Sequence, residues 1–540
     1  MEISVWRGSL LLISAVLCAP LLIVVSHLFI PEVSAWQHLR STVLADYVAN
    51  SLTLTLGVGI GTLLIGSVTA WCMTHYEFAA RRILRWSLLL PLAMPAYIIA
   101  YTYTGMLDVA GPVQQLLREW FNVNYGDYYF PEIRSLPAAI LLMSLVLYPY
   151  VYILARTAFS EQSQRMREVS SLHGRTSASH FWQVSLPLAR PALFTGAALA
   201  MMEALADYGT VHYFGINTFT TGIFRSWYAM GNRNVATQLA AILCLFVLLV
   251  LVFEQHSRQK LRFYQQGAKQ QSNQRDALVG WKSALVSFLC ALPVILGFVI
   301  PVVQLLWWSA SQYEQLWARD FVDLITTTFS LGILTAVLVV VIAIVFSYQQ
   351  RWSASSLSRW QLRLLSLGYA IPGMVIAVGV LIMLGWGDAQ LNHLSHTLTG
   401  DYVGLVLSGT AVALILAYCI RFLSIALQNT ESGMMRISPA IDDAASTLGA
   451  GKFRLLAKIH TPLLRASVIS AALLVFVDVL KELPATLVLR PFNVNTLAVR
   501  AYELASDERL IDAALPAITI VLVGLIPIVV LTKALDKGYS

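Results

Sequence analysis

The segment that decides the fold reads SPAIDDAASTLGAGKFRLLAKIHTPLL and occupies residues 438–464. Ser438 can cap the amino end of a helix, and Pro439 suits the first helical position. Gly449 fits the left-handed residue that commonly ends a helix. A second, amphipathic segment is expected from Lys452 onward, before the chain turns back. The segment therefore predicts two short helices joined at a glycine.

The same plan occurs once more, much earlier in the chain. Residues 163–189 read SQRMREVSSLHGRTSASHFWQVSLPLA, with a glycine and a proline at matching places. Gly449 follows Gly174, and Pro462 follows Pro187, by the same 275 positions (449 − 174 and 462 − 187). A fixed offset between distant parts of a chain is the signature of an internal repeat. The sequence therefore predicts two homologous halves.

Both polar segments interrupt a strongly apolar chain. Of the 540 residues, 57% are hydrophobic and only 12% are charged, against about 45–50% and about 25% in soluble domains. Runs of roughly 20 apolar residues, long enough to cross a bilayer, recur about twelve times. We expect an all-α integral membrane protein with about twelve transmembrane helices, arranged as two parallel six-helix repeats. The expected spans are residues 9–30, 51–74, 86–107, 136–158, 192–214, 235–253, 282–308, 328–348, 362–386, 403–427, 466–488 and 513–533.

The repeat divides the chain into three regions. We expect a first half over residues 1–255 with its polar loop at 160–190, and a second half over 280–540 with its loop at 435–465. Residues 256–279 should form a flexible cytoplasmic linker, because they are rich in Gln, Lys, Arg and Ser. Lys and Arg gather in the loops on the side of both termini, which predicts that this side is cytoplasmic. The net charge of +7 then reflects topology and contact with membrane lipids, with no nucleic-acid partner.

Each polar loop holds an acidic residue, five further residues, a glycine, and later Leu-Pro or Thr-Pro. This pattern resembles the "EAA" loop of binding-protein-dependent ABC importer permeases. The matching positions are Glu168, Gly174, Leu186 and Pro187 in the first loop, and Asp443, Ala444, Ala445, Gly449 and Pro462 in the second. Val169 and Ser170 depart from the family pattern, so the first loop is the less regular copy.

The resemblance carries expectations about fold and partners. It implies a type I ABC importer permease-like architecture in a bacterial cytoplasmic (inner) membrane, crossed many times. In that family the helix of the EAA loop docks into a cleft of a separate ATPase. The resemblance therefore implies two copies of an ABC ATPase subunit on the cytoplasmic face and a substrate-binding protein on the outer face.

Further segments resemble the fused permeases of ferric-iron importers. They are LADYGT at residues 205–210, FTTGI at 219–223 and VLKELP at 479–484. This resemblance implies ferric iron as the cargo, delivered by the periplasmic or extracellular binding protein. Permeases for thiamine, sulfate, molybdate and polyamines share the architecture, so these cargoes stay open as alternatives.

Acidic residues stand inside two of the expected spans. Glu203 and Asp207 in the first half, and Asp478 and Glu482 in the second, are each four positions apart. This spacing places each pair on one helix face. A charge at the centre of a span costs roughly 2.5–3.5 kcal/mol on insertion scales, so it usually faces protein or water. Carboxylates suit a hard cation, which predicts a transient Fe³⁺ site without tight binding, with Tyr208 as a neighbouring oxygen.

A structural role for these acids is the alternative. They could pair with Lys481, Arg225 or Arg500 and hold the two halves in register. Proline residues should also shape this region, because Pro95 and Pro372 are expected to break their spans.

Other functions fit the sequence less well. The segment GAGKF at residues 449–453 lacks the first glycine and the Ser/Thr of a phosphate-binding loop. ATP and Mg are therefore expected in a partner chain, with no cofactor and no catalytic residue in this one. An ion-gradient-driven secondary transporter is a weaker alternative, because it needs no pair of matched docking loops. No combination of nucleophile, base and metal ligands in the sequence indicates an enzyme.

Overall fold

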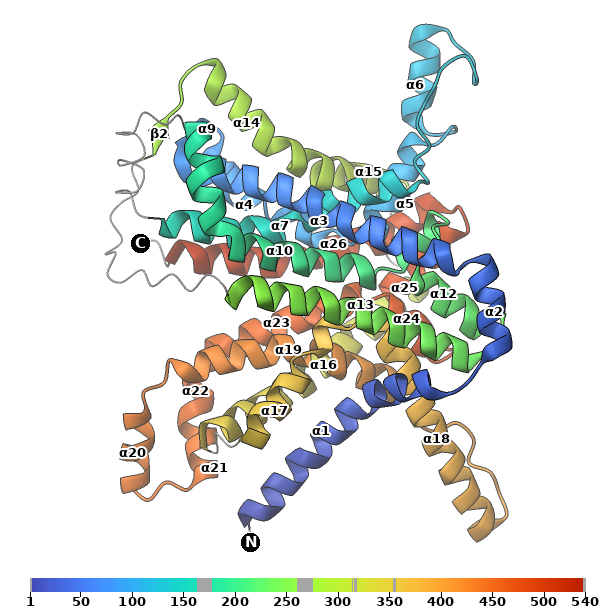
Figure 1. The fold of residues 1–540 in the computed structure, drawn as a ribbon, viewed down its shortest axis with the longest axis vertical. Helices are drawn as coiled ribbons and strands as arrows, with labels where there is room; N and C mark the ends of the chain where they lie inside the picture. The colour runs from blue at the N-terminus through green and yellow to red at the C-terminus, as the bar shows by residue number, and fades with distance from the viewer. Residues whose placement is uncertain are drawn as a thin grey trace.

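The computed structural model describes residues 2–162, 177–259, 275–312, 314, 318–352 and 356–537. Within these ranges the chain is almost wholly helical, as the apolar runs predicted. Its only strands there are β1 (Tyr76–Glu77) and β2 (Asp276–Ala277), which pair in parallel. Figure 1 shows the long helices lying side by side, with shorter helices projecting from both ends of the bundle.

The helices of the first half run in chain order as follows: α1 (Glu2–Ser26), η1 (His27–Phe29), α2 (Val33–Thr42), α3 (Leu44–His75), α4 (Arg81–Ser87), η2 (Leu90–Ala93), α5 (Ala96–Leu107), α6 (Pro112–Phe121), α7 (Leu136–Glu161), α9 (Ser177–His180), η3 (Phe181–Ser185), α10 (Leu186–Ala206), α11 (Gly209–Tyr213), α12 (Phe219–Phe224), η4 (Arg225–Ala229) and α13 (Arg233–Gln259).

Those of the second half are α14 (Trp281–Val294), η5 (Ile295–Val299), α15 (Ile300–Ala310), α16 (Arg319–Trp352), α17 (Ser356–Leu365), η7 (Gly368–Ala370), α18 (Gly373–Thr399), α19 (Ala411–Met435), α20 (Pro439–Thr447), α21 (Lys452–Leu455), η8 (Leu456–His460), α22 (Thr461–Leu463), α23 (Arg465–Lys481), α24 (Pro484–Leu489), α25 (Leu497–Ser506) and α26 (Leu510–Lys537).

The number of membrane spans agrees with the expectation. In the described part of the chain, 10 helices are long and apolar enough to cross a membrane, or up to 12 if each of two bent helix pairs forms one span. One bent pair joins Arg81–Ala93 to Ala96–Phe121 at 93°, and the other joins Lys452–Leu463 to Arg465–Lys481 at 75°. The chain therefore combines straight spans with broken ones.

Four of the expected spans are not continuous helices, and the sequence predicted two of these four breaks. Two of the breaks lie at prolines that were expected to break spans: Pro95 is extended before α5, and Pro372 precedes α18. The other two lie at acidic residues: α10 ends before Asp207, and α23 ends before Glu482. Apolar residues resume after each of the four places, so hydropathy alone could not show the breaks.

The two halves exchange their first spans. Helix α1 packs against α17, α18 and α19 of the second half, while α14 and α15 pack against α3, α4 and α5 of the first. Figure 1 shows α14 and α15 beside α3 and α5, on the opposite side of the molecule from α1. Glycines permit the close approach: a Cβ at Gly379 would collide with the carbonyl of Pro20, and one at Gly297 with that of Leu145. The exchange binds the halves into one unit.

Candidate functional site

Helix α20 begins and ends as the sequence predicted. Pro439 is its first residue, and the Ser438 hydroxyl accepts a hydrogen bond from the amide of Ala440 at 3.4 Å. Gly449 follows the helix with φ of +78°, the left-handed conformation that favours glycine. The second segment starts at Lys452 and continues through α21 and η8. The predicted helix–glycine–helix unit is therefore present.

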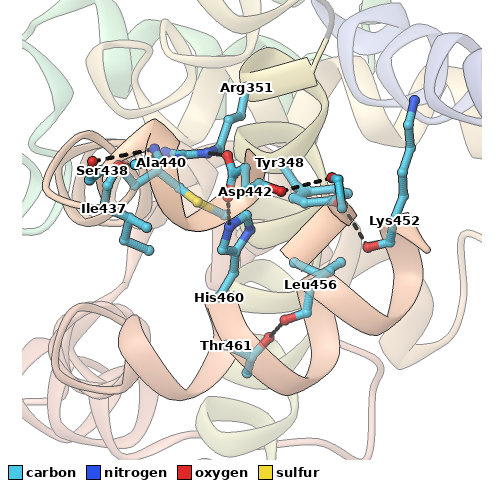
Figure 2. A network of polar contacts seen from close by, with 12 residues as sticks. Tyr348, Arg351, Ile437, Ser438, Ala440, Asp442, Lys452, Leu456, His460 and Thr461 are labelled. Atoms are coloured by element: carbon cyan, nitrogen blue, oxygen red, sulfur yellow. Dashed lines mark hydrogen bonds and ion pairs between the residues drawn. The ribbon is translucent and has the colours of Figure 1, made fainter. Parts of the chain in front are cut away.

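One buried carboxylate fastens this unit to the long helices (Figure 2). Asp442 accepts a hydrogen bond from Arg351 Nε at 2.6 Å, and its other oxygen lies 2.7 Å from His460 Nε2. Arg351, on α16, also donates to the carbonyls of Met434 at 2.9 Å and Ile437 at 3.0 Å. Burial raises the pKa of Asp442, but the hydrogen bonds from Arg351 and His460 outweigh it and hold that pKa below its usual range.

The outer face of α20 is exposed in the described structure. Asp443 and Ala444 are exposed, whereas Ala445 is buried on the inner face with Asp442. Just beyond the helix, Leu448 is 87% exposed. Apolar side chains exposed at a loop tip are typical of a protein–protein contact. Asp442 therefore holds α20 against the long helices, whereas Asp443 lies on its exposed face.

The first loop is described only in part. Glu168 and Gly174 lie outside the described residues. Leu186 and Pro187 begin α10, and the proline occupies its first turn, where a missing amide hydrogen has no cost. Pro462 takes the corresponding place in the short helix α22.

All four acids of the expected spans line one cavity of about 130 Å³ between the halves. Glu203 lies on α10 and Asp207 at its end, while Asp478 lies on α23 and Glu482 at its end. Five further polar side chains line the same cavity: Tyr97, Tyr150, Tyr369, Arg421 and Lys481. The halves therefore bring together acids that lie about half the chain length apart.

The second acid of each pair marks a helix break and caps the next helix. Asp207 accepts hydrogen bonds from the amides of Thr210 at 3.0 Å and Val211 at 3.1 Å, at the start of α11. Glu482 accepts two bonds of 3.0 Å from amides at the start of α24. The prediction that each pair lies on one continuous helix face is therefore wrong. The capping geometry does follow the repeat, because Asp207 and Glu482 cap the next helix in the same way.

Two bases stand beside the acids of the second half. Lys481 Nζ lies 2.7 Å from Asp478 Oδ1, and Arg421 Nη1 lies 3.7 Å from Glu482 Oε1. The first pair was expected from the sequence as a possible brace. Arg421 was missed, although an arginine inside the apolar run of α19 is itself a signal of a functional or paired charge.

Other expected residues lie elsewhere. Tyr208 does not line the cavity, and its ring stacks on His212 with centroids 5.0 Å apart. Arg225 and Arg500 do not line it either, and Arg225 donates to Asn217 Oδ1 at 3.2 Å. Among the residues that the structure describes, no three His, Cys, Asp or Glu side chains converge closely enough to hold a metal ion.

The fold and this site define a membrane permease built from two homologous halves around a shared acidic cavity. The chain belongs to the family of binding-protein-dependent transport system inner membrane components, whose profile matches residues 62–262 and again residues 340–540. The two matches confirm the internal repeat. The chain is therefore a multi-pass membrane permease that serves binding-protein-dependent transport, with transport and not catalysis as its own role.

The relatives of this chain are named for different cargoes, among them ferric iron and molybdenum. The Fe(3+)-transport system permease protein FbpB 2 of Haemophilus influenzae is 25% identical over 498 residues, which cover 91% of this chain and 90% of that protein. The ferric transport system permease protein FbpB of Actinobacillus pleuropneumoniae is 23% identical, over 85% of this chain and 66% of its own length. The molybdenum transport system permease protein ModB of H. influenzae is 22% identical, over 37% of this chain and 87% of its own.

Proposed function

We propose that this chain is the membrane-spanning subunit of an ATP-driven importer of ferric iron. One observation carries the proposal: each half contributes two carboxylates to a single cavity between the halves. Carboxylate oxygens suit a hard trivalent cation. Relatives named as ferric permeases match this chain over most of its length, which supports the same cargo.

The proposed assembly places partners on both faces. Two copies of an ABC ATPase dock on the cytoplasmic side, one at α20 and one at loop 160–190, and they bind and hydrolyse ATP with Mg. A binding protein delivers the cargo on the outer side of the bacterial inner membrane, and both termini lie in the cytoplasm. The chain comprises a first half (1–255), a linker (256–279) and a second half (280–540). The exposed apolar Leu448 and Phe453 support the contact at α20.

The proposed mechanism runs from α20 to the cavity. When the ATPases close, they pull α20, and the Asp442–Arg351 contact passes this motion to α16. Helix α16 packs against α19 and α23, which carry Arg421 and Asp478 of the cavity. The halves then rock about their interface, and the cavity opens to one side of the membrane at a time.

The charge of the cavity favours a cation over an oxyanion. Four carboxylates against two bases leave a formal charge of −2 (2 − 4) at the site. This charge opposes molybdate and sulfate, although permeases named for molybdenum and sulfate are among the relatives. Thiamine and polyamines carry positive charge, so they are the competing cargo class.

The test is ATP hydrolysis in proteoliposomes that contain the full chain with its candidate ATPase and binding protein. Ferric-loaded binding protein should stimulate hydrolysis, and Gly174→Asp or Gly449→Asp should abolish the stimulation, because Gly449 forms a bend and the sequence pattern predicts the same role for Gly174. Stimulation by another cargo alone would contradict iron. Transport driven by a proton or sodium gradient, with no ATPase bound, would contradict the whole proposal.

A further inference from the structure

The acids of the cavity follow the internal repeat, but its bases do not. At the offset of 275 positions, the acids form two matched pairs, one from each half. Lys481 corresponds instead to Ala206, and Arg421 corresponds to Val146 (481 − 206 and 421 − 146). All four of these positions line the cavity. Both positive charges of the cavity therefore come from the second half.

Lys481 lies among groups of both halves. Its ammonium is 2.7 Å from Asp478 Oδ1, and it also interacts electrostatically with Glu203 and Tyr150 of the first half. Across the described residues, the Glu203 carboxylate has no hydrogen bond or ion pair. Lys481 thus neutralises Asp478, while Glu203 lies near the lysine without a close partner of its own.

Two other side chains leave polar atoms unsatisfied in the cavity wall. Arg421 is only 8% exposed, and neither its Nε nor its Nη1 has a hydrogen-bond partner within the described structure. The same holds for the hydroxyl of Tyr97, a residue only 5% exposed. Buried polar atoms of this kind are normally satisfied by protein, water or a ligand. They add unpaired polar groups to the cavity wall beside the acids.

Room for the arginine is provided by a glycine. A Cβ at Gly373 would collide with Arg421 Nη1 and lie 2.6 Å from Glu482 Oε1. Gly373 is the first residue of α18, directly after the break at Pro372. The helix break, the glycine and the ion pair therefore form one local arrangement, which holds a positive charge at the cavity.

We propose that Lys481 and Arg421 are resident counter-cations of the transport pathway. They neutralise Asp478 and Glu482 while the cavity is empty, and they yield these acids to a cationic cargo when it enters. By competing with the cargo, they keep its binding weak enough for release. This inference rests on the proposed import of a hard cation, and it assigns Lys481 and Arg421 a role in that transport.

The first test measures cation binding to the full chain in lipid nanodiscs, with no partner proteins. Tb³⁺ serves as a hard trivalent probe, detected by luminescence that nearby tyrosines sensitise. Lys481→Met should tighten Tb³⁺ binding about tenfold or more, because a competing charge is removed. Lys481→Arg should restore the affinity of the unmodified protein, and Glu203→Gln added to Lys481→Met should cancel the gain. Unchanged or weaker binding in Lys481→Met would overturn the inference.

A matched variant tests the same idea with a charge added instead of removed. Ala206→Lys places a base at the equivalent position of the first half, and it should weaken Tb³⁺ binding about tenfold. This result does not depend on whether Lys481→Met folds well. No change in Ala206→Lys would contradict a competition between bases and cargo.

A transport measurement separates counter-cations from structural braces. In proteoliposomes, Lys481→Met should lower the KM for cargo-loaded binding protein and also lower kcat, because tighter binding slows release. Loss of kcat with an unchanged KM and unchanged Tb³⁺ affinity would indicate a brace and overturn the inference. If ferric-loaded binding protein gives no stimulation while the Tb³⁺ shifts occur, the iron assignment falls and the counter-cation role stands.

Discussion

The ends of the two halves that carry the polar loops share a sequence plan but differ in the contacts that the structure describes there. In the second half, Asp442 forms a buried network with Arg351 and His460. At the repeat-equivalent positions, 275 residues earlier, the sequence has an arginine, a tyrosine and a serine. An arginine, a tyrosine and a serine supply no carboxylate, so these three positions cannot repeat the network centred on Asp442.

Aromatic packing takes its place in the described part of the first half. The Trp71 ring lies edge-on to Phe159 with centroids 5.6 Å apart, and 4.9 Å from Phe181. Nearby, the Ser185 hydroxyl and His180 Nε2 are 3.2 Å apart. The comparison shows that the repeat preserves the spacing of the glycine and proline of each loop while the residues around them diverge. The two ends should then respond differently to mutation and to acid.

Asp442→Ala should produce the largest difference between the ends. It leaves the half-buried Arg351 without its carboxylate, and the cost should approach the roughly 3–5 kcal/mol of a broken buried pair. Ser185→Ala, at the position equivalent to His460, removes one neutral hydrogen bond and should cost only about 1 kcal/mol. Hydrogen–deuterium exchange of residues 436–464 and 177–189 measures both effects. Equal loosening by the two variants would contradict the comparison.

Gly449→Ala should have a smaller effect. Alanine at a φ of +78° costs about 1–2 kcal/mol, because its Cβ approaches the following carbonyl oxygen. Gly451→Ala is the matched control, since Gly451 has φ of −68° and open space around it. The first variant should reduce stimulated ATP hydrolysis, and the second should leave it near normal. Similar losses in both would show that the bend is not the sensitive feature.

Low pH should loosen residues 439–464 of the second half before it loosens residues 177–189 of the first. The folded-state pKa of Asp442 lies below its unfolded value of about 3.9. Its contribution to stability is therefore complete above about pH 4 and is lost as the pH falls through the folded-state pKa. The effect should be smaller than that of Asp442→Ala, because the protonated acid still forms hydrogen bonds. Exchange at residues 439–464 should rise below about pH 4, ahead of residues 177–189, and a parallel rise would count against the network.

Gly373→Ala should change stability least. Its Cβ would collide with the ends of two side chains, Arg421 and Glu482, and lie 3.4 Å from the amide nitrogen of Ala485, so the cost should be about 1 kcal/mol if these side chains shift. Near the two proline breaks the repeat offset is 277 positions, because Pro372 follows Pro95 by 277, and the first half has Ala96 at the position of Gly373. The substitution should displace Arg421 and alter Tb³⁺ affinity while the thermal unfolding temperature stays nearly constant. A large loss of stability with unchanged affinity would assign Gly373 to packing alone.

Much of the fold was predictable from local patterns in the sequence. Apolar runs predicted the spans, one offset predicted the repeat, and Pro439 and Gly449 predicted the bounds of α20. The breaks at Asp207 and Glu482 were not predictable in this way, because an acidic residue inside an apolar run does not by itself end a helix. The packing of each first span against the other half was not predictable either. Periodicity shows that a helix face is buried, but it does not show which helix covers that face.

Some residues of the site were predictable from the sequence, and others were not. The four acids were found because charge inside an apolar run is rare. Arg421 obeys the same rule and could have been found with them. The anchoring role of Asp442 depends on Arg351, which is 91 residues away, and the sequence offers no signal for that contact.

The most direct test of the account is uptake of radioactive ferric iron into proteoliposomes that contain the full transporter, ATP and no ion gradient. Glu203→Gln combined with Asp207→Asn should remove two cavity charges while the amide cap at Asp207 is retained. The account predicts ATP-dependent accumulation by the unmodified protein and about tenfold slower accumulation by the variant. Equal uptake by both would contradict a pathway through the acidic cavity, and uptake that needs an ion gradient would contradict an ATP-driven importer.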